Sequence, residues 1–277
     1  MDSKPLWTCQ HIRLKRCREG AMIYNINDRY IGRALDKYGE ISHDEVLFLQ
    51  QLIRPGMTVL DLGANIGLLT VPVARLVHPG GKVIAFEPQR IVYQMLSGNL
   101  ALNAIDNVVA HNSGVGRTTG FITVPSLDYT QPNNFGGIAI GGSKAAGDVV
   151  PLVTVDSLSL AACDLIKIDV EGMELEVLEG AARTIQQFRP RLFLENDRAA
   201  QSPALIEHLL ALDYRLYWFT PPLYRADNFF GDEQNIFGRL ASIDMLCVPR
   251  AGRLAITVTG CAEITSGDSK PPVPWNL

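Results

Sequence analysis

The stretch Val59–Gly67, with the sequence VLDLGANIG, decides the fold of this 277-residue chain. It starts as a short apolar run typical of a buried strand, and it contains two glycines spaced G-x-x-x-G. Gly63 permits a tight turn after the strand, and Gly67 lets the next helix start close to a ligand. Free N–H groups at a helix start favour a carboxylate or a phosphate. The pattern therefore predicts a strand over 58–63, a helix over 66–77 and a ligand site between them.

Strands and helices alternate along the rest of the chain. Such an alternation indicates βαβ units and a mostly parallel sheet, which is an α/β fold. Ligands on these sheets bind beyond the carboxyl ends of the strands, so the residues at those ends become the candidates for a site. The predicted strands are 82–87, 108–112, 120–125, 149–155, 165–170, 191–195, 214–219 and 242–248, and the predicted helices are 24–54, 89–103, 172–188 and 203–212.

Composition excludes several classes of protein. Apolar residues make up 47% of the chain, enough to bury a sizeable core, so wholesale disorder is excluded. The net charge is -4, and no global positive field would attract nucleic acid, so no nucleic-acid partner is expected. No stretch approaches the roughly 18 apolar residues of a membrane span.

The cysteines and the two ends of the chain complete the outline. Five cysteines without a C-x-x-C pair argue against a disulfide framework and a structural zinc site, and they favour a cytoplasmic protein. No apolar segment follows the basic N-terminal residues, so a secretory signal is not predicted. We expect residues 1–23 to be a basic, poorly ordered arm, residues 24–249 the working domain and residues 250–277 a partly loose tail.

Polar residues stand at the ends of the first three predicted strands. Asp61 adds a negative charge before the glycine turn, which suits a ligand ammonium and repels phosphate. Glu87 lies 20 residues after Gly67, at the place where an acid accepts the hydroxyls of a ribose. Ser113 follows the third strand, where it can bond an adenine nitrogen. A ligand with an amino acid group beside a ribose is S-adenosylmethionine.

Acidic residues also end the fourth and fifth strands of the alternating pattern. Asp169 and Glu195 should stand at adjacent strand ends, within reach of one substrate hydroxyl. A carboxylate there acts as a general base or orients the hydroxyl, and Glu171 is a third candidate. Lys167 lies in a buried strand, where an unpaired charge is costly, so it should pair with a carboxylate such as Glu195 or Glu171.

Two segments resemble motifs of known methyltransferases. The stretch Val59–Gly67 together with Phe86-Glu87-Pro88 resembles class I S-adenosylmethionine-dependent methyltransferases. The segment Ile166–Glu174, IKIDVEGME, is similar to the hallmark of the FkbM-type family, and the resemblance extends over about residues 24–249. It implies a Rossmann-like, seven-stranded, mostly parallel sheet with an antiparallel last strand and helices on both faces.

The resemblance also implies a reaction. It implies transfer of a methyl group from S-adenosylmethionine, usually to an oxygen, on a glycan or a polyketide-type natural product. It further implies that Tyr38, Gly39 and Glu40 fold over the methionine end of the cofactor. The residues expected at the cofactor are Glu40, Asp61, Gly63, Ala64, Asn65, Gly67, Glu87, Pro88, Ser113 and Asp169, and the catalytic candidates are Asp169, Glu195 and Glu171. The residues leave open whether the acceptor is a free sugar, a lipid-linked glycan, a polyketide or a phenol.

Two loops rich in aromatic and amide side chains, Asn133–Gly142 and Pro221–Leu240, should flank the strand ends. Such side chains suit a ring-shaped, polyhydroxylated acceptor, although a lid that packs its aromatic rings on itself is the alternative. Asp169, Glu195 and Asn196 resemble the magnesium site of catechol-type O-methyltransferases. Their Glu-Asn pair departs from the Asp-Asn of that site, and no required metal is predicted.

Two other functions compete with methyl transfer. A nicotinamide-dependent dehydrogenase should carry G-x-G-x-x-G and a pair of residues for hydride transfer, and the chain shows neither clearly. A non-catalytic cofactor-binding module would have lost its chemistry. The intact acids Asp61, Glu87 and Asp169 argue against such a module.

Overall fold

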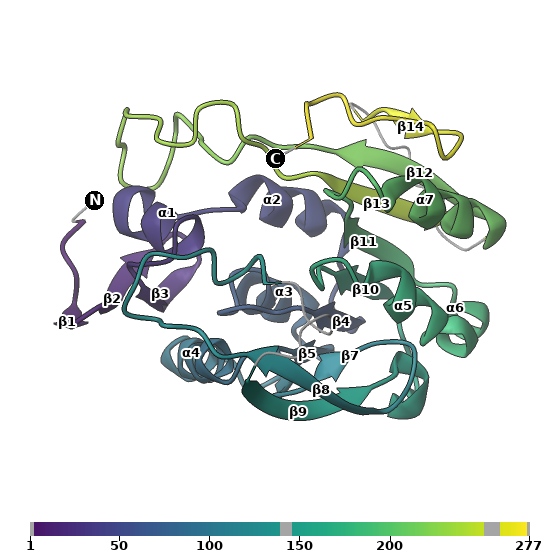
Figure 1. Ribbon diagram of the computed structural model, residues 1–277, viewed down its shortest axis with the longest axis horizontal. Coiled ribbons are helices and arrows are strands. Elements are labelled where there is room, and N and C mark those ends of the chain that lie inside the picture. Colours follow the sequence, from purple (N-terminus) through teal and green to yellow (C-terminus); the bar gives the residue numbers. More distant parts are fainter. Residues whose placement is uncertain (1–2, 139–145, 252–260, 276–277) are drawn as a thin grey trace.

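The computed structural model describes residues 3–138, 146–251 and 261–275 (Figure 1). Its main sheet confirms the α/β fold. The spatial order of its strands is β14 (Glu263–Ile264), β12 (Tyr214–Phe219), β13 (Asp244–Pro249), β11 (Arg191–Glu195), β10 (Leu165–Ile168), β4 (Thr58–Leu62), β5 (Lys82–Phe86) and β6 (Val108–His111). The strands β6, β5, β4, β10 and β11 run parallel, and β13 is antiparallel to both of its neighbours, β11 and β12. The short β14, from the C-terminal tail, adds an eighth strand to the seven that the resemblance implied.

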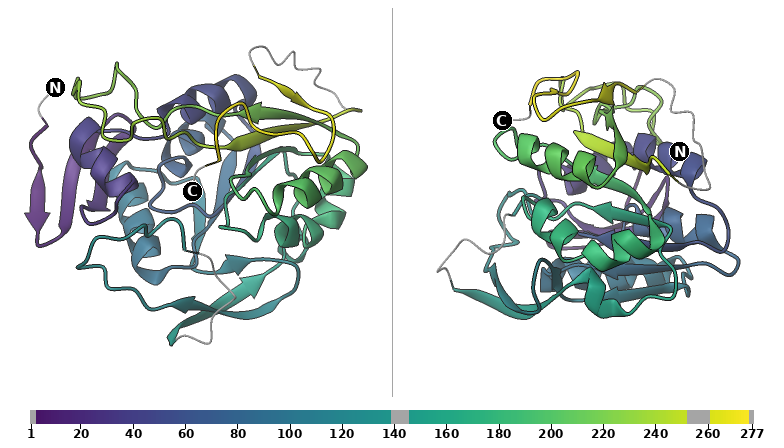
Figure 2. Two further views of the ribbon diagram at one scale, coloured as in Figure 1. Left: turned by 45° about the horizontal axis from the view of Figure 1, so that its top comes forward. Right: turned by 90° about the vertical axis from the view of Figure 1, so that its right-hand side faces the viewer.

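Helices cover both faces of the main sheet (Figure 2). Leu60, Leu62 and Ile166 contribute to one apolar cluster with residues of α5, α6 and α7, whereas Val59 and Leu165 contribute to another with α2 and α3. Successive side chains of a strand point to opposite faces, so a continuous apolar run such as Thr58–Leu62 fits a strand buried on both sides. The helices are α1 (Ile31–Tyr38), α2 (His43–Leu52), α3 (Thr70–Val77), α4 (Arg90–Leu102), α5 (Glu174–Glu179), α6 (Ala182–Phe188) and α7 (Ser202–Ala211).

The N-terminal residues form a three-stranded antiparallel sheet, so the expectation of a poorly ordered arm was wrong. Its strands are β1 (Trp7–Cys9), β2 (Ile12–Cys17) and β3 (Gly20–Asn25), which means that the first helix begins at Ile31 and not at residue 24. Met22 and Tyr24 alternate into the core and are fully buried. On α4, Asn99 and Asn103 hydrogen-bond to the backbone of β3. The division into arm, domain and tail remains a prediction.

A third sheet follows β6. It consists of β7 (Gly114–Val115), β8 (Gly120–Pro125) and β9 (Gly147–Val153), and a short 3-10 helix (Val155–Leu158) leads from it to β10. Parts of the loop Asn133–Gly142 and of the C-terminal tail lie outside the described residues. All five cysteines are free, and among the described residues no helix is long and apolar enough to cross a membrane.

Candidate functional site

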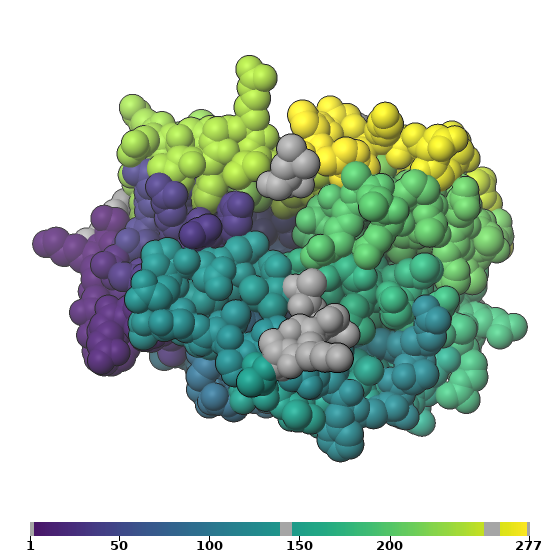
Figure 3. All heavy atoms as spheres, viewed as in Figure 1, coloured from purple at the N-terminus to yellow at the C-terminus, as the bar shows by residue number. Residues whose placement is uncertain are grey.

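A cavity of about 450 Å³ lies at the carboxyl ends of β4, β5, β10 and β11. The segment before α2, the loop at residues 134–138 and the start of β13 complete its walls. The surface is hollowed on the face seen in Figure 3, where the segments coloured purple, teal and green meet. The position agrees with the rule that α/β sheets bind ligands beyond the carboxyl ends of their strands.

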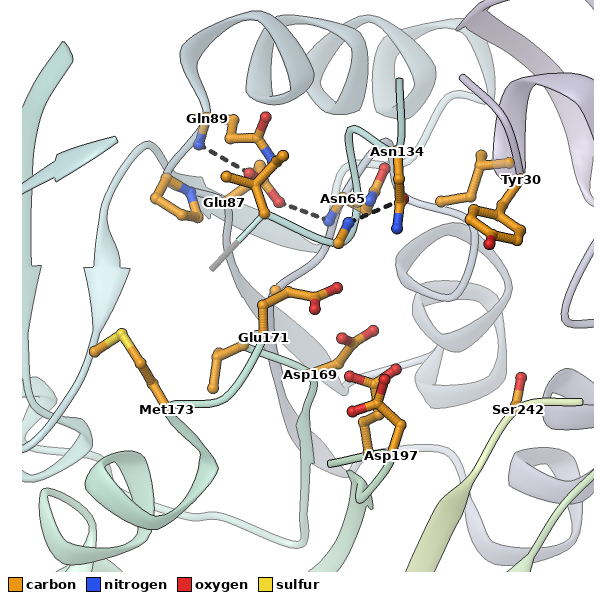
Figure 4. Close-up of a pocket in the computed structure, with 18 of the residues that line it drawn as sticks. Tyr30, Asn65, Glu87, Gln89, Asn134, Asp169, Glu171, Met173, Asp197 and Ser242 are labelled. Atoms are coloured by element: carbon orange, nitrogen blue, oxygen red, sulfur yellow. Dashed lines mark hydrogen bonds between the residues drawn. The ribbon is translucent and has the colours of Figure 1, made fainter. Parts of the chain in front are cut away.

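Glu87, directly after β5, is the central residue of one half of the cavity (Figure 4). It is buried, its Oε1 accepts the N–H of Gln89 at 2.8 Å, and its Oε2 accepts the N–H of Asn65 at 3.0 Å. Burial raises the pKa of Glu87 to about 7. The predicted cofactor residues that line the cavity are Gly63, Asn65, Glu87, Pro88, Ser113 and Asp169.

Gly63 lies between this half of the cavity and a second, acidic half that contains Asp169, Glu171 and Glu195. Its φ is +81°, and a Cβ added there would lie 1.7 Å from the carbonyl oxygen of Asp169. Lys167 Nζ donates to the carbonyl oxygen of Gly63 at 2.6 Å, and it lies 3.2 Å from Asp169 and 3.4 Å from Asp61. The prediction that Lys167 pairs with a carboxylate is therefore confirmed, but its partners are Asp169 and Asp61 and not Glu195 or Glu171.

The acidic half of the cavity brings the three catalytic candidates together. One carboxylate oxygen from each of Asp169, Glu171 and Glu195 lies within 4.8 Å of the others. The parallel strands β10 and β11 explain this, because Ile168 pairs with Leu194 and the next residue of each strand is the acid. Glu171 adopts a positive φ of 57° in the loop that follows Asp169.

Burial and mutual repulsion raise the pKa values in this acidic cluster. Burial, and then the neighbouring Asp169, raise the pKa of Glu171 to about 8, although Arg198 lies 2.8 Å from it. Burial, and then Asp169 and Glu171, hold the pKa of Glu195 well above its usual range. Glu171 and Glu195 therefore hold their protons to a higher pH than an exposed glutamate does.

Two functional candidates in the cavity wall, Glu45 and Asp244, were not predicted. On α2, Glu45 is buried and accepts a hydrogen bond from the hydroxyl of Ser242 at 3.0 Å. Asp244, the first residue of β13, lies opposite Glu195 in the sheet. The sequence did contain a sign of Glu45, because it lies on the same buried stripe of α2 as Leu49 and Leu52. A glutamate is rarely buried without a partner or a function.

Several predicted cofactor residues do not line this cavity. Asp61 is buried and accepts a hydrogen bond from the hydroxyl of Thr70 at 2.5 Å, so it does not face a ligand ammonium. Glu40 pairs with Arg18 and Arg225 and does not fold over the cavity. The remaining ones are Ala64, whose N–H donates to the carbonyl oxygen of Phe86, and Gly67, where an added Cβ would meet a methyl of Leu96.

The first helix of the βαβ pattern also starts later than predicted. It begins at Thr70. In the turn before it, backbone N–H groups already have acceptors within the protein: the N–H of Asn65 donates to the carboxylate of Glu87, and the N–H of Gly67 donates to the carbonyl oxygen of Ala64. These groups are therefore not free to bind a ligand carboxylate. Asn196 is buried and donates to Ser202 and Met245, so it does not join Asp169 and Glu195 in a catechol-type site.

The aromatic residues of Pro221–Leu240 pack on the N-terminal part of the chain. Phe237 stacks on Tyr30, Tyr224 lies against Tyr38, and Phe229 and Phe230 lie below Arg18 and Lys15. Only Leu223 and Leu240 of this loop line the cavity. The interpretation of these aromatic rings as an acceptor-binding lid was wrong for the described residues.

Comparison with known proteins agrees with the motifs. The Methyltransferase FkbM domain matches residues 61–216. Methyltransferase sdnD of Sordaria araneosa is 32% identical over an alignment of 154 residues, and the match covers 44% of this chain and 59% of that protein. The 31-O-demethyl-FK506 methyltransferase FkbM of Streptomyces tacrolimicus is 28% identical over an alignment of 196 residues, and the match covers 60% of this chain and 74% of that protein.

Among solved structures, the methyltransferase FkbM from Methylobacillus flagellatus KT is 22% identical, with a TM-score of 0.48. The match covers 79% of this chain and 55% of that chain, so the aligned part spans little more than half of the solved protein. The domain match covers more than half of this chain and includes Asp61, Glu87, Asp169 and Glu195. The chain therefore belongs to the FkbM family of methyltransferases.

Proposed function

We propose that the protein transfers the methyl group of S-adenosylmethionine to a hydroxyl oxygen of a glycan or natural-product acceptor. The observation that carries the proposal is the single cavity in which Glu87 and Gly63 stand beside the carboxylates of Asp169, Glu171 and Glu195. The 31-O-demethyl-FK506 methyltransferase is named for an oxygen acceptor, which supports the choice of oxygen.

The residues of the cavity fit S-adenosylmethionine. Each oxygen of Glu87 accepts one backbone N–H, and a carboxylate oxygen can accept further bonds, so Glu87 keeps the capacity for two ribose hydroxyls. Gly63 and Asn65 offer a close backbone approach, and Ser113 offers a hydroxyl for the adenine. The residues proposed to hold the cofactor are Gly63, Asn65, Glu87, Pro88 and Ser113.

The charge of the cavity favours a cationic cofactor over a dinucleotide. Among the described lining residues, Arg198 is the only basic side chain, and it pairs with Glu171. The acidic lining residues are Glu45, Glu87, Asp169, Glu171, Glu195, Asp197 and Asp244. Such a set attracts a sulfonium and an ammonium and repels a pyrophosphate. This argues against the nicotinamide-dependent alternative.

Asp169 is the proposed acceptor of the hydroxyl proton. When bound, S-adenosylmethionine supplies an activated methyl group, and the bonding electrons stay on sulfur as the acceptor oxygen takes the methyl. Two of the three clustered carboxylates form a described ion pair, and Asp169 is the more exposed of the two, with 39% of its side chain exposed against 19% for Glu171. Protonated Glu171 and Glu195 would donate hydrogen bonds that orient the same hydroxyl.

An acceptor screen with a labelled methyl donor tests this function. Purified protein is incubated with panels of sugars, lipid-linked glycans, macrolides, phenols and amines, and labelled product and S-adenosylhomocysteine are measured. We expect stoichiometric label and S-adenosylhomocysteine with a hydroxylated acceptor. Calorimetry with S-adenosylmethionine and, separately, with NADH measures cofactor choice. Binding of NADH alone, or label found only on amine acceptors, would contradict the proposal.

A further inference from the structure

One wall of the cavity is apolar and comes from outside the matched family domain. Three partly exposed side chains, those of Tyr30, Leu223 and Leu240, line it, and we call this set the apolar wall. All three pack against the same apolar cluster of buried residues. None of them lies within residues 61–216, the part of the chain that matches the family domain. The apolar wall is therefore built by segments that flank that domain in this chain.

Backbone pairing places the apolar wall beside the acidic half of the cavity. Asp244 pairs with Glu195 across β13 and β11. Leu240 lies four residues before Asp244, and its carbonyl oxygen accepts the N–H of Leu223 at 2.9 Å. The proposed cofactor residues follow β4, β5 and β6, which lie on the other side of β10 and β11 in the sheet. The two leucines and the cofactor residues therefore flank the clustered carboxylates from opposite sides.

Tyr30 completes the apolar wall from the N-terminal part of the chain. Its N–H donates to Asp28 Oδ1 at 2.9 Å, and Asp28 is itself buried, so the backbone at the start of α1 is held in place. Figure 4 shows Tyr30 on the side of Asp169 that lies away from Met173. A preformed surface of aromatic and aliphatic side chains beside a few polar groups is typical of a site for a small molecule.

The apolar wall offers few hydrogen bonds to a ligand. Ser242, close to Leu240 in the chain, already donates its hydroxyl hydrogen to Glu45 at 3.0 Å. A sugar face that lies on the apolar wall would lose the water around several hydroxyls without new partners, which costs free energy for each of them. A hydrocarbon face has no such loss and gains from its burial. The apolar wall therefore favours an acceptor with an apolar face next to its reacting hydroxyl.

We propose that the apolar wall binds a hydrocarbon face of the acceptor and orients it, so that a hydroxyl at the edge of that face points to Asp169. The acceptor is then a ring-containing alcohol with one apolar face, and it is not a free sugar. The inference rests on the proposed function for the reaction at this hydroxyl. The preference for an apolar face is a binding property of the protein alone, and it can be measured without methyl transfer.

Binding of two small probes to the full chain, without cofactor, tests the apolar wall. 2-Adamantanol carries one hydroxyl on a hydrocarbon cage, and methyl β-D-glucopyranoside carries several hydroxyls on a ring of similar size. Ligand-detected NMR titrations give the Kd of each probe, and we expect 2-adamantanol to bind at least tenfold more tightly. Leu223→Ser and Leu240→Ser should each weaken its binding at least tenfold, because a missing apolar contact in a pocket is typically worth about 10–200-fold. Leu240→Met keeps the apolar volume and should retain the affinity.

Leu152→Ser is the matched control. Leu152 is also a partly exposed leucine of the cavity, but it lies on β9 and pairs with Gly114, next to Ser113 in the cofactor half. This variant should bind 2-adamantanol as the wild type does. Thermal melts of all four variants give their Tm, and each Kd is measured below it, so that a lost fold is not taken for a lost contact.

Four results would overturn the proposal: a glucoside that binds as tightly as 2-adamantanol, no saturable binding of 2-adamantanol, a Kd that neither serine variant of the apolar wall changes, or a loss confined to Leu152→Ser. A failure of the proposed methyl transfer would be seen separately, because no S-adenosylhomocysteine would form with any acceptor. The Kd values of the two probes do not depend on that reaction.

Discussion

Gly63 lies so close to Asp169 that a Cβ at position 63 would come 1.7 Å from the carbonyl oxygen of residue 169. The glycine turn of the first βαβ unit and the acidic strand end are therefore one packed structure. Lys167 binds both sides of it, since its ammonium donates to the carbonyl oxygen of Gly63 and lies 3.2 Å from the carboxylate of Asp169. The position of Asp169 in the cavity thus depends on Gly63, which was predicted to turn the chain and to lie at the cofactor, but not to contact Asp169.

Gly63→Ala should be strongly destabilising, and Gly56→Ala is the matched control. Both glycines have a similar positive φ, +81° and +86°, but nothing lies within 4 Å of a Cβ at Gly56. Positive φ alone should cost Gly56→Ala about 1–2 kcal/mol of unfolding free energy. Gly63→Ala should lose at least about 1–3 kcal/mol more, because the clash is with backbone. Urea denaturation measures both, and equal losses would mean that the contact with Asp169 relaxes freely.

The parts of the site that were predicted correctly follow from the geometry of parallel sheets. Asp169 and Glu195 each come directly after a buried apolar run, and neighbouring parallel strands end at the same edge, so their proximity could be predicted from spacing alone. The same reasoning placed Glu87 at the end of β5. It failed for Asp61, which lies one residue inside β4 and points to Lys167 and Thr70 instead of the cavity.

The errors elsewhere arise from tertiary contacts that local patterns do not encode. The alternation of Met22 and Tyr24 is typical of a strand, but the many basic residues of the N-terminal segment favoured a solvated arm instead. Two of these basic residues, Arg13 and Lys15, form ion pairs with Asp36 of α1 in the structure. Glu45 and Asp244 reach the cavity from elements far apart in the sequence. Predicting them as site residues requires knowledge of how α2 and β13 pack around β11, and the spacing of residues along the sequence does not give that packing.

Binding of S-adenosylmethionine should strengthen as pH rises through about 7, where Glu87 loses its proton. The ionised carboxylate only accepts hydrogen bonds, whereas the protonated form gives up one acceptor site for a donor. Below its pKa, affinity should therefore fall up to about tenfold per pH unit. Calorimetry between pH 5.5 and 8.5 measures this slope. Glu87→Gln should bind at least tenfold more weakly at pH 8 and lose the slope, and a slope retained in that variant would assign the titration to another group.

Phe237→Ala should destabilise the fold but leave the KM for the acceptor unchanged. Phe237 is 6% exposed and contacts Tyr30 and Tyr38, so its truncation should cost about 3–5 kcal/mol of unfolding free energy. The control is Phe121→Ala on β8, which is 75% exposed and should change stability by less than about 0.5 kcal/mol. Once an acceptor is known, its KM should be the same in both variants below their melting temperatures. A raised KM for the acceptor in Phe237→Ala, with unchanged stability, would indicate that the aromatic residues of the loop Pro221–Leu240 do contact the acceptor.

Asp169→Asn should separate chemistry from cofactor binding. The substitution keeps shape and hydrogen-bonding capacity but removes the charge that accepts the hydroxyl proton. Lys167 keeps Asp61 and the carbonyl oxygen of Gly63 as partners, so the variant should fold with a Tm close to that of the wild type. General-base assistance is typically worth about 10²–10⁴ in rate, so methyl transfer should slow at least a hundredfold. Single-turnover measurements with saturating S-adenosylmethionine isolate this step, and calorimetry gives the cofactor affinity. A loss that appears mainly in cofactor affinity would make Asp169 a binding residue and leave Glu195 as the better candidate for the base.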